Sequence, residues 1–235
     1  MSDYTHDFAI VSEGVTDHAV LKNILIGYFK EKGHSPRITP IQPLTDATIE
    51  GNPEWTRFGT WENVFRFLRE GRHRAALAYS EYIIVQIDTD RSEHTNFGVP
   101  HTEFGQRISP EELVVRVRDR LKREIGTDDF EKYVKRFVFA ICVHELECWL
   151  LPLWTSESKK AAKTKGCLTT VNKALKRNNK TPIREERKKF ECYNNVSLPF
   201  RQKGKLREVA PLNPSLKLFF DELESRRIEF LEDSD

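Results

Sequence analysis

The chain has 235 residues and a formal net charge of +2, with 38% hydrophobic and 31% charged residues. This is the composition of a globular protein with a core, and no apolar run approaches the roughly 18–20 residues that cross a bilayer, which excludes an integral membrane protein. The polar, acidic start from Met1 to Asp7 lacks the pattern of a secretory signal, so we expect a cytoplasmic protein.

The four cysteines, Cys142, Cys148, Cys167 and Cys192, include no C-x-x-C pair. Thiols in the cytosol are normally kept reduced, and disulfide frameworks are typical of small secreted domains. We therefore expect all four cysteines to be reduced.

Basic residues are concentrated between Glu157 and Glu208, a segment with sixteen Lys and Arg against five Asp and Glu. This asymmetry indicates a polyanionic partner such as DNA or RNA, although a lysine-rich, solvated helical surface would give the same count. We expect a catalytic domain in residues 1–155 and a basic, mostly helical extension in residues 156–235 that packs on it. Aromatic residues lie among the basic ones and would either stack on bases or pack the second subdomain. They are Trp154, Phe190, Tyr193 and Phe200.

Hydrophobic patterns predict alternating strands and helices along the chain. In order, they indicate a strand over His6–Ser12, a helix over Asp17–Lys32 with Thr16 as its N-cap, and a proline-weakened edge strand over Arg37–Leu44. A helix capped by Thr60, a buried strand over Tyr82–Asp88 and a long loop over Arg91–Ile108 follow. The last are a helix from a capping box at Ser109 to about Ile125, a strand over Arg136–Val143, and a helix from His144 that Pro152 should end or kink. This alternation predicts an α/β fold with a mainly parallel sheet flanked by helices.

Acidic residues follow three of the predicted strands. Glu13 comes after the first strand, Asp88 and Asp90 after the central strand, and Glu145 and Glu147 after the last. Ligands of such sheets bind at the carboxyl ends of the strands, so we expect these acids to meet at one edge. If the extended conformation persists to Asp90, Asp88 and Asp90 point the same way.

Neighbouring carboxylates repel one another, and a divalent cation relieves this repulsion. Oxygen ligands of this kind suit Mg²⁺ or Mn²⁺. Asp17, four residues after Glu13, either joins the set or only interacts favourably with the helix dipole. Together with Asp88 and Asp90, these residues are sufficient to hold one or two ions. A two-metal site clamps the attacking and leaving oxygens of a phosphodiester and lowers the pKa of a bound water.

These motifs resemble the Toprim domain of topoisomerases, bacterial primases, recombination proteins and nucleases of the overcoming-lysogenization-defect (OLD) type. The resemblance rests on Glu13-Gly14-x-Thr16-Asp17 after the first strand and on Asp88-x-Asp90 after a later one. The segment His144–Leu151 is similar to the glutamate-containing strand-to-helix piece of small OLD-like proteins, and Asn213–Leu223 is similar to their terminal helix. The resemblance covers most of residues 6–155 and, more loosely, the tail.

The resemblance implies a Toprim-like Rossmannoid fold and a Mg²⁺-dependent nuclease that cleaves DNA or RNA. In this family the main metal site would correspond to Glu13, Asp88 and Asp90. The second site would use Asp17 together with either Glu147 or Glu145. We favour Glu147, since Leu146, Trp149 and Leu150 can then face the core of the protein.

The resemblance also implies a basic residue and partners. OLD-like enzymes use a lysine beyond the last acidic motif, for which Lys203 and Lys205 are the candidates here, and its role would be to stabilise charge on the phosphorane. Toprim nucleases of this size often act beside a separate ATPase, frequently in phage defence. We also expect a homodimer.

Three other interpretations explain part of the same sequence. A D-x-D motif after a strand also occurs in aspartate-nucleophile phosphatases and in metal-dependent nucleotide-sugar enzymes, but these leave Glu13 and Asp17 unexplained. His144-Glu145-x-x-Cys148 is similar to the zinc-binding helix H-E-x-x-H, but the sequence suggests no third ligand nearby. A non-catalytic nucleic-acid-binding or regulatory module predicts binding that survives loss of the aspartate pair.

Overall fold

Four parallel strands form the central sheet of the computed structural model, which describes residues 6–43, 60–184 and 189–228. The strands lie in the order β2-β1-β3-β6, and each neighbouring pair runs parallel. Their bounds are β1 His6–Val11, β2 Ile38–Gln42, β3 Ser80–Asp88 and β6 Phe137–Cys142. The predicted α/β fold is confirmed, and the proline-containing strand β2 lies at an edge as expected. Leu44, the last residue of the predicted second strand, lies outside the described residues.

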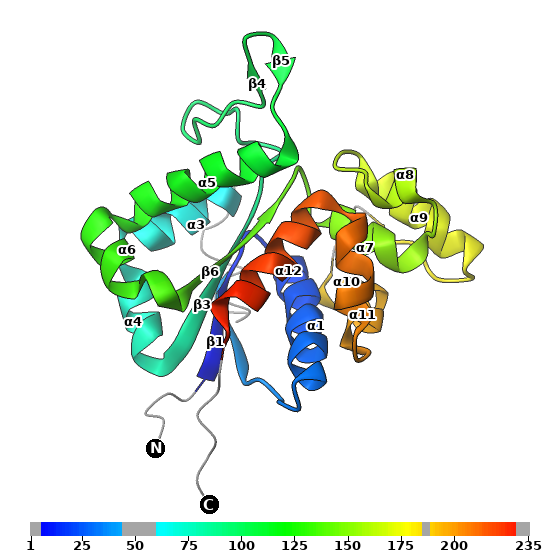
Figure 1. Cartoon of the computed structure of the whole chain (residues 1–235), viewed down its shortest axis with the longest axis horizontal. Coiled ribbons are helices and arrows are strands. Elements are labelled where there is room, and N and C mark those ends of the chain that lie inside the picture. The colour runs from blue at the N-terminus through cyan, green and yellow to red at the C-terminus, as the bar shows by residue number, and fades with distance from the viewer. Residues whose placement is uncertain (1–5, 44–59, 185–188, 229–235) are drawn as a thin grey trace, which may run out of the picture.

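Helices cover both faces of this sheet (Figure 1). The longer ones are α1 Val15–Glu31, α3 Thr60–Arg69, α4 Arg72–Tyr79, α5 Pro110–Ile125, α7 Glu147–Trp154, α9 Cys167–Arg177, α10 Phe190–Ser197 and α12 Pro214–Arg226. Shorter ones are α6 Thr127–Tyr133, α8 Ser158–Ala161, α11 Lys205–Val209 and the 3-10 helices η2 Val134–Arg136, η4 Leu198–Arg201 and η5 Ala210–Leu212. Phe8 and Ile10 of β1 pack with α1, α7, α10 and α12, whereas Ala9 and Val11 pack with α3 and α5. Alternation along the strand thus gives two apolar faces and a three-layer structure.

Helix starts agree with the sequence in one case and differ in another. The cap at Ser109 is confirmed, because its Oγ accepts the N–H of Glu112 at 3.1 Å. Thr16 is not the N-cap of α1; the helix begins at Val15 after Gly14, whose N–H donates to the carboxylate of Asp17 at 2.7 Å. Thr60 begins α3, but its side chain lies outside the described residues.

Two helices and one hairpin have no counterpart in the predicted elements. Helices α4 and α6 are short, eight and seven residues, and neither was predicted from the hydrophobic pattern. The predicted loop Arg91–Ile108 contains an antiparallel hairpin of β4 Thr102–Glu103 and β5 Gln106–Arg107, which projects from the molecule beyond α5 (Figure 1). Strands of two residues are too short to show an alternating pattern.

The helix after β6 begins at Glu147 rather than at His144, which has a positive φ of 63°. It continues past Pro152 to Trp154. Proline lacks the N–H that would bond to the carbonyl of Cys148 four residues earlier. Asn213 Nδ2 donates to that carbonyl at 3.4 Å instead, so α12 supplies the bond that the proline cannot make.

The helices after residue 155 share the core of the sheet. Tyr193 and Phe200 are 1% and 0% exposed and belong to the same cluster as Phe8 of β1. Core packing, and not base stacking, is therefore the role of these two aromatic residues. Trp154 and Phe190 are partly buried against the same cluster.

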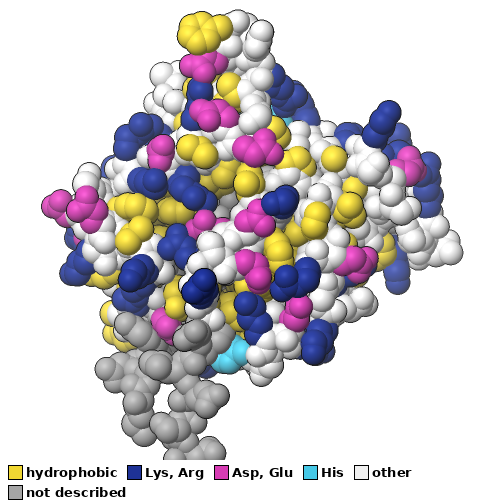
Figure 2. Space-filling model, in the orientation of Figure 1, with side chains coloured by type: hydrophobic (Ala, Val, Ile, Leu, Met, Phe, Trp, Pro, Cys, Tyr) yellow, Lys and Arg dark blue, Asp and Glu magenta, His cyan; other side chains and the backbone are white. Residues whose placement is uncertain are grey.

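The surface carries mixed charge on the face shown in Figure 2. Lys and Arg side chains are spread over this face with Asp and Glu between them, so the basic residues do not form one continuous patch there. None of the helices within the described ranges combines the length and apolarity that crossing a membrane requires.

Candidate metal centre

Asp88 ends β3 beside the turn that follows β1. The chain leaves β1 towards β2 on one side, and β3 lies on the other, so the strand order reverses between β1 and β3. Crevices at such switch points are the usual ligand sites of open α/β sheets. Glu13 is fixed there, because its Oε1 accepts the backbone N–H of Asp88 at 2.7 Å.

Gln86 links the two strands beneath this point. Its Nε2 donates to Asp88 Oδ1 at 2.9 Å, and its Oε1 accepts the N–H of Glu13 at 3.2 Å. Gln86 is fully buried, so its amide orients both acids from the interior.

The loop after β6 closes the third side of the site. The N–H of Leu146 donates to Asp88 Oδ2 at 3.3 Å, and the N–H groups of Thr89 and Asp90 donate to the carbonyl of His144, each at 3.0 Å. The N–H of His144 in turn donates to Thr89 Oγ1 at 2.8 Å. These bonds hold the ends of β3 and β6 together at the carboxyl edge of the sheet.

Five acidic side chains gather around this edge. The pKa of Asp88 is raised well above its usual value, first by burial and then by the charges of four neighbours, which are Glu13, Asp17, Glu147 and Asp90. The pKa of the thiol of Cys142, below the site, is also raised, by burial and by three of the same acids. Sequence and fold thus bring together acids from all three predicted strand ends.

Glu147 and Glu145 point to different places. Glu147 is 5% exposed and accepts a hydrogen bond from the hydroxyl of Tyr193 on α10, whose pKa is raised by burial and then by Glu147. Glu145 instead accepts the N–H groups of Cys167 and Leu168, at the start of α9. Glu147 is therefore the acid of this pair that faces Asp88, which agrees with the preference from sequence.

Asp90 belongs to the cluster, but the backbone that carries it does not have the predicted extended conformation. β3 ends at Asp88, so the extended conformation does not persist to Asp90. The side chain of Asp90 is half-exposed and lies 4.0 Å from Arg91, yet its charge still reaches Asp88. It forms the solvent-facing border of the cluster.

The structure places Lys205 away from the acids, whereas the role expected of Lys203 stays a prediction. Lys205 begins α11, and its neighbour Arg207 pairs with Glu31 in the last turn of α1 at 3.1 Å. Asp17 lies in the first turn of the same helix. A rise of about 1.5 Å per residue separates these two ends by about 21 Å.

Two cations lie near His144, in the loop after β6, and were missed from sequence. The pKa of His144 is lowered to about 4, first by burial and then by His101, Arg107 and Lys165. Its neutral ring accepts a hydrogen bond at Nε2 from Arg107 of the hairpin. His101 stacks edge-on against it and bonds to the carbonyl of Thr89 at 2.8 Å. Arg107 lies in a two-residue strand and Lys165 in an irregular segment, and neither segment has a periodic pattern that points to a role.

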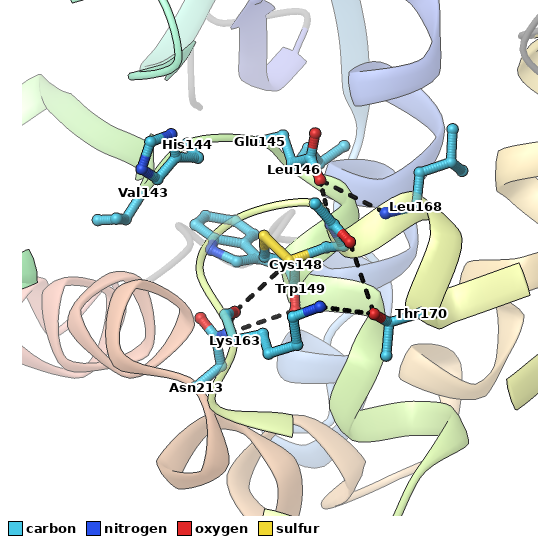
Figure 3. Close-up of a disulfide and its surroundings, with 12 residues drawn as sticks. Val143, His144, Glu145, Leu146, Cys148, Trp149, Lys163, Leu168, Thr170 and Asn213 are labelled. Atoms are coloured by element: carbon cyan, nitrogen blue, oxygen red, sulfur yellow. Dashed lines mark hydrogen bonds between the residues drawn. A yellow bond between two sulfur atoms is a disulfide. The ribbon is translucent and has the colours of Figure 1, made fainter. Parts of the chain in front are cut away.

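Two of the four cysteines are not reduced, contrary to the sequence-based expectation. Cys148 and Cys167 form a disulfide that joins α7 to α9 (Figure 3), whereas Cys142 and Cys192 are free thiols. Their separation of nineteen residues matches no standard motif, so only the fold shows that they meet.

The fold and the site together define the chain as a Rossmann-like α/β protein with an acidic cluster at the carboxyl edge of its sheet. The chain belongs to the family DUF4276, described as a domain of unknown function, which matches residues 12–189. The match includes Asp88 and the four acids around it, and it ends before Tyr193. No curated protein and no solved structure matches the chain.

Proposed function

We propose that this protein is a Mg²⁺-dependent nuclease of the Toprim type, similar to small OLD-like enzymes. The observation that carries the proposal is the gathering of four acids around Asp88 at the switch point of a parallel sheet. The E-G-x-T-D and D-x-D motifs supply four of these five acids, after the first and central strands, in the order that the Toprim resemblance implies.

The residues present fit a hard divalent cation. All five side chains offer carboxylate oxygens, which Mg²⁺ and Mn²⁺ prefer over nitrogen and sulfur ligands. Burial and then the charges of its four neighbours raise the pKa of Asp88, and a bound cation would relieve the repulsion among these acids. Glu13, Asp88 and Asp90 would hold one ion, and Asp17 with Glu147 a second. When bound, such ions polarise a phosphodiester and lower the pKa of a bound water.

The protein's own groups orient the ligands and receive the substrate. Gln86 and the backbone N–H of Leu146 hold the two oxygens of Asp88, and Tyr193 holds Glu147. Arg107 and Lys165 lie beside His144, whose carbonyl accepts the N–H groups of Thr89 and Asp90, and there they would contact phosphate oxygens of the nucleic acid. They join Lys203 as candidate phosphate-binding cations in this proposal.

Cleavage of a nucleic-acid panel tests this function. Supercoiled plasmid, single-stranded DNA and total tRNA are incubated with Mg²⁺, Mn²⁺ or EDTA, using wild type and Asp88→Asn. The matched control is Asp119→Asn, which removes a carboxylate paired with Lys122 on the surface of α5. We expect metal-dependent cleavage by wild type and by the control, and none by Asp88→Asn.

Other outcomes decide against the proposal. Binding of nucleic acid without cleavage, unaffected by Asp88→Asn and by EDTA, would identify a non-catalytic regulatory module. Cleavage of a phosphomonoester but of no polynucleotide would favour a phosphatase. We also propose that the protein is a cytoplasmic homodimer that acts beside a separate ATPase in phage defence. If no substrate is cleaved, either by the protein alone or together with an ATPase co-purified from the same cell, the nuclease proposal is rejected.

A further inference from the structure

A second group of metal-binding side chains lies behind the acidic cluster. The Sγ atoms of Cys148 and Cys167 and a carboxylate oxygen of Glu145 all lie within 4.8 Å of one another (Figure 3). Both cysteines are fully buried and Glu145 is partly buried. The three residues come from the start of α7, the start of α9 and the loop before α7, so only the fold assembles them.

We propose that reduction of the disulfide converts this group into a zinc site, distinct from the Mg²⁺ site. Two thiolates and one carboxylate form a ligand set that selects Zn²⁺ over Mg²⁺, because thiolates are soft ligands and Mg²⁺ prefers oxygen alone. Three protein ligands leave the fourth tetrahedral position to water. His144 is not a ligand, since it points away from the sulfur atoms (Figure 3) and bonds to Arg107.

Glu145 has an oxygen to offer without losing its present contacts. The N–H groups of Cys167 and Leu168 both donate to Oε1 of Glu145. The carboxylate can therefore keep capping α9 through Oε1 and bind an ion through Oε2. This arrangement also fixes the carboxylate beside the sulfur of Cys167.

The backbone of the site does not depend on the disulfide. Asn213 Nδ2 donates to the carbonyls of Cys148, Ala161 and Lys163, at 3.4, 3.2 and 3.0 Å. One buried amide thus holds the segments before α9 and within α7 in place. After reduction, the two thiols stay close enough to share an ion.

The two metal sites use neighbouring residues of the chain. Glu147 bonds to Tyr193 and raises the pKa of Asp88, whereas Glu145 turns towards α9. Cys148 follows Glu147 directly, so the two sites share the start of α7 but no ligand.

The redox step balances with a dithiol reductant. The disulfide gains two electrons and two protons and becomes two thiols, while the dithiol is oxidised to its own disulfide. When Zn²⁺ binds, the two thiol protons pass to solvent.

Zinc stoichiometry of the full-length protein tests the proposal. Oxidised and dithiothreitol-reduced samples are desalted without oxygen, incubated with Zn²⁺ in the presence of excess Mg²⁺, desalted again and analysed for bound zinc. We expect one zinc per reduced chain and none at this site in the oxidised chain. Co²⁺ in place of Zn²⁺ should give thiolate-to-metal charge-transfer absorption only in the reduced protein.

Three variants and a matched control locate the site. Cys148→Ser and Cys167→Ser should each weaken zinc binding at least about tenfold, and Glu145→Gln should weaken it while keeping the thiolate absorption of Co²⁺. Cys192→Ser removes a free, half-buried thiol elsewhere and should change nothing. Circular dichroism checks the fold of each variant.

Two results would overturn the proposal. Reduced wild-type protein that retains no zinc and shows no thiolate absorption with Co²⁺ would exclude the site, and this measurement needs no variant. Zinc bound equally by wild type and Cys148→Ser would place the ion elsewhere. Because zinc is counted without any cleavage assay, failure of the nuclease proposal would leave this result unaffected.

Discussion

The substitution Gly27→Ala tests how the last part of the chain packs on α1. A Cβ atom at Gly27 would lie 1.8 Å from the carbonyl oxygen of Phe200 and 2.8 Å from its carbonyl carbon. Carbon and oxygen atoms that are not bonded approach to about 3.3 Å at closest, so η4 would have to move by about 1.5 Å. Both contacts are backbone atoms, and no side-chain rotation relieves them.

The expected cost follows from three opposing contributions. Alanine favours a helix over glycine by about 1 kcal/mol. Overpacking costs about 1–3 kcal/mol, and moving η4 breaks the hydrogen bonds of Asn23, each worth about 1 kcal/mol. These join Asn23 to Ser197 at 2.7 Å and to Arg201 at 2.5 Å. We expect a net loss of about 2–4 kcal/mol in the free energy of unfolding.

Urea unfolding in EDTA, followed by circular dichroism and tryptophan fluorescence, measures this loss. Gly33→Ala is the control, because nothing lies within 4 Å of its Cβ and only its φ of +83° causes strain, worth about 1–2 kcal/mol. A Gly27→Ala protein as stable as wild type would refute the packing of η4 against α1.

Three further predictions concern charge and the candidate site. In EDTA, the free energy of unfolding should fall as the pH rises above about 4. Burial and neighbouring acids raise the pKa of Asp88 in the folded state above 3.8, so the folded state binds a proton that the unfolded state has already released. The slope from this proton is at most about 1.4 kcal/mol per pH unit, and urea titrations should show it reduced in Asp88→Asn. Asp7→Ala should cost about 2–3 kcal/mol at pH 7, because the buried carboxylate accepts the N–H and guanidinium of Arg37 at 2.7 and 2.8 Å. Burial opposes ionisation of Asp7, but these bonds lower the pKa of its carboxyl below the ordinary value. Wild type should therefore lose this stability as the pH falls below 3.8. Unfolding of wild type and Asp7→Ala at pH 7 and pH 3 tests this expectation. If the nuclease proposal holds, Tyr193→Phe should raise the Mg²⁺ concentration for half-maximal cleavage about tenfold, since Tyr193 orients Glu147; an unchanged titration would contradict this role.

The sequence predicted the features that depend on local patterns. Apolar runs located all four strands of the central sheet. Three of these strands carry Glu13, Asp88 and Glu147 to one edge at their carboxyl ends, because parallel strands share a direction. The order of strands and the switch point between β1 and β3 required the structure, since hydrophobic periodicity contains no information on which strands pair.

Local sequence patterns could not predict the features that depend on contacts between residues distant in the sequence. The hydroxyl of Tyr193 meets Glu147 across 46 residues. The disulfide and the position of Arg107 likewise depend on how α9 and the hairpin pack. The resemblance selected Lys203 and Lys205 by their place after the acidic motifs, and chain order does not fix how far Lys205 lies from the site.

Because α10 and α12 lie near the end of the chain, the candidate site becomes complete late in synthesis. All five acids of the cluster have left the ribosome once Glu147 has emerged, but of the helices that pack on the sheet face with Phe8 and Ile10, only α1 is then complete. The cover of that face stays incomplete until Phe200 and Phe219 arrive from residues beyond the family match. A nascent chain that stalls before α10 therefore holds every acid and still lacks both the core beneath them and the hydroxyl that orients Glu147. The last helices decide when the chain first has a complete site.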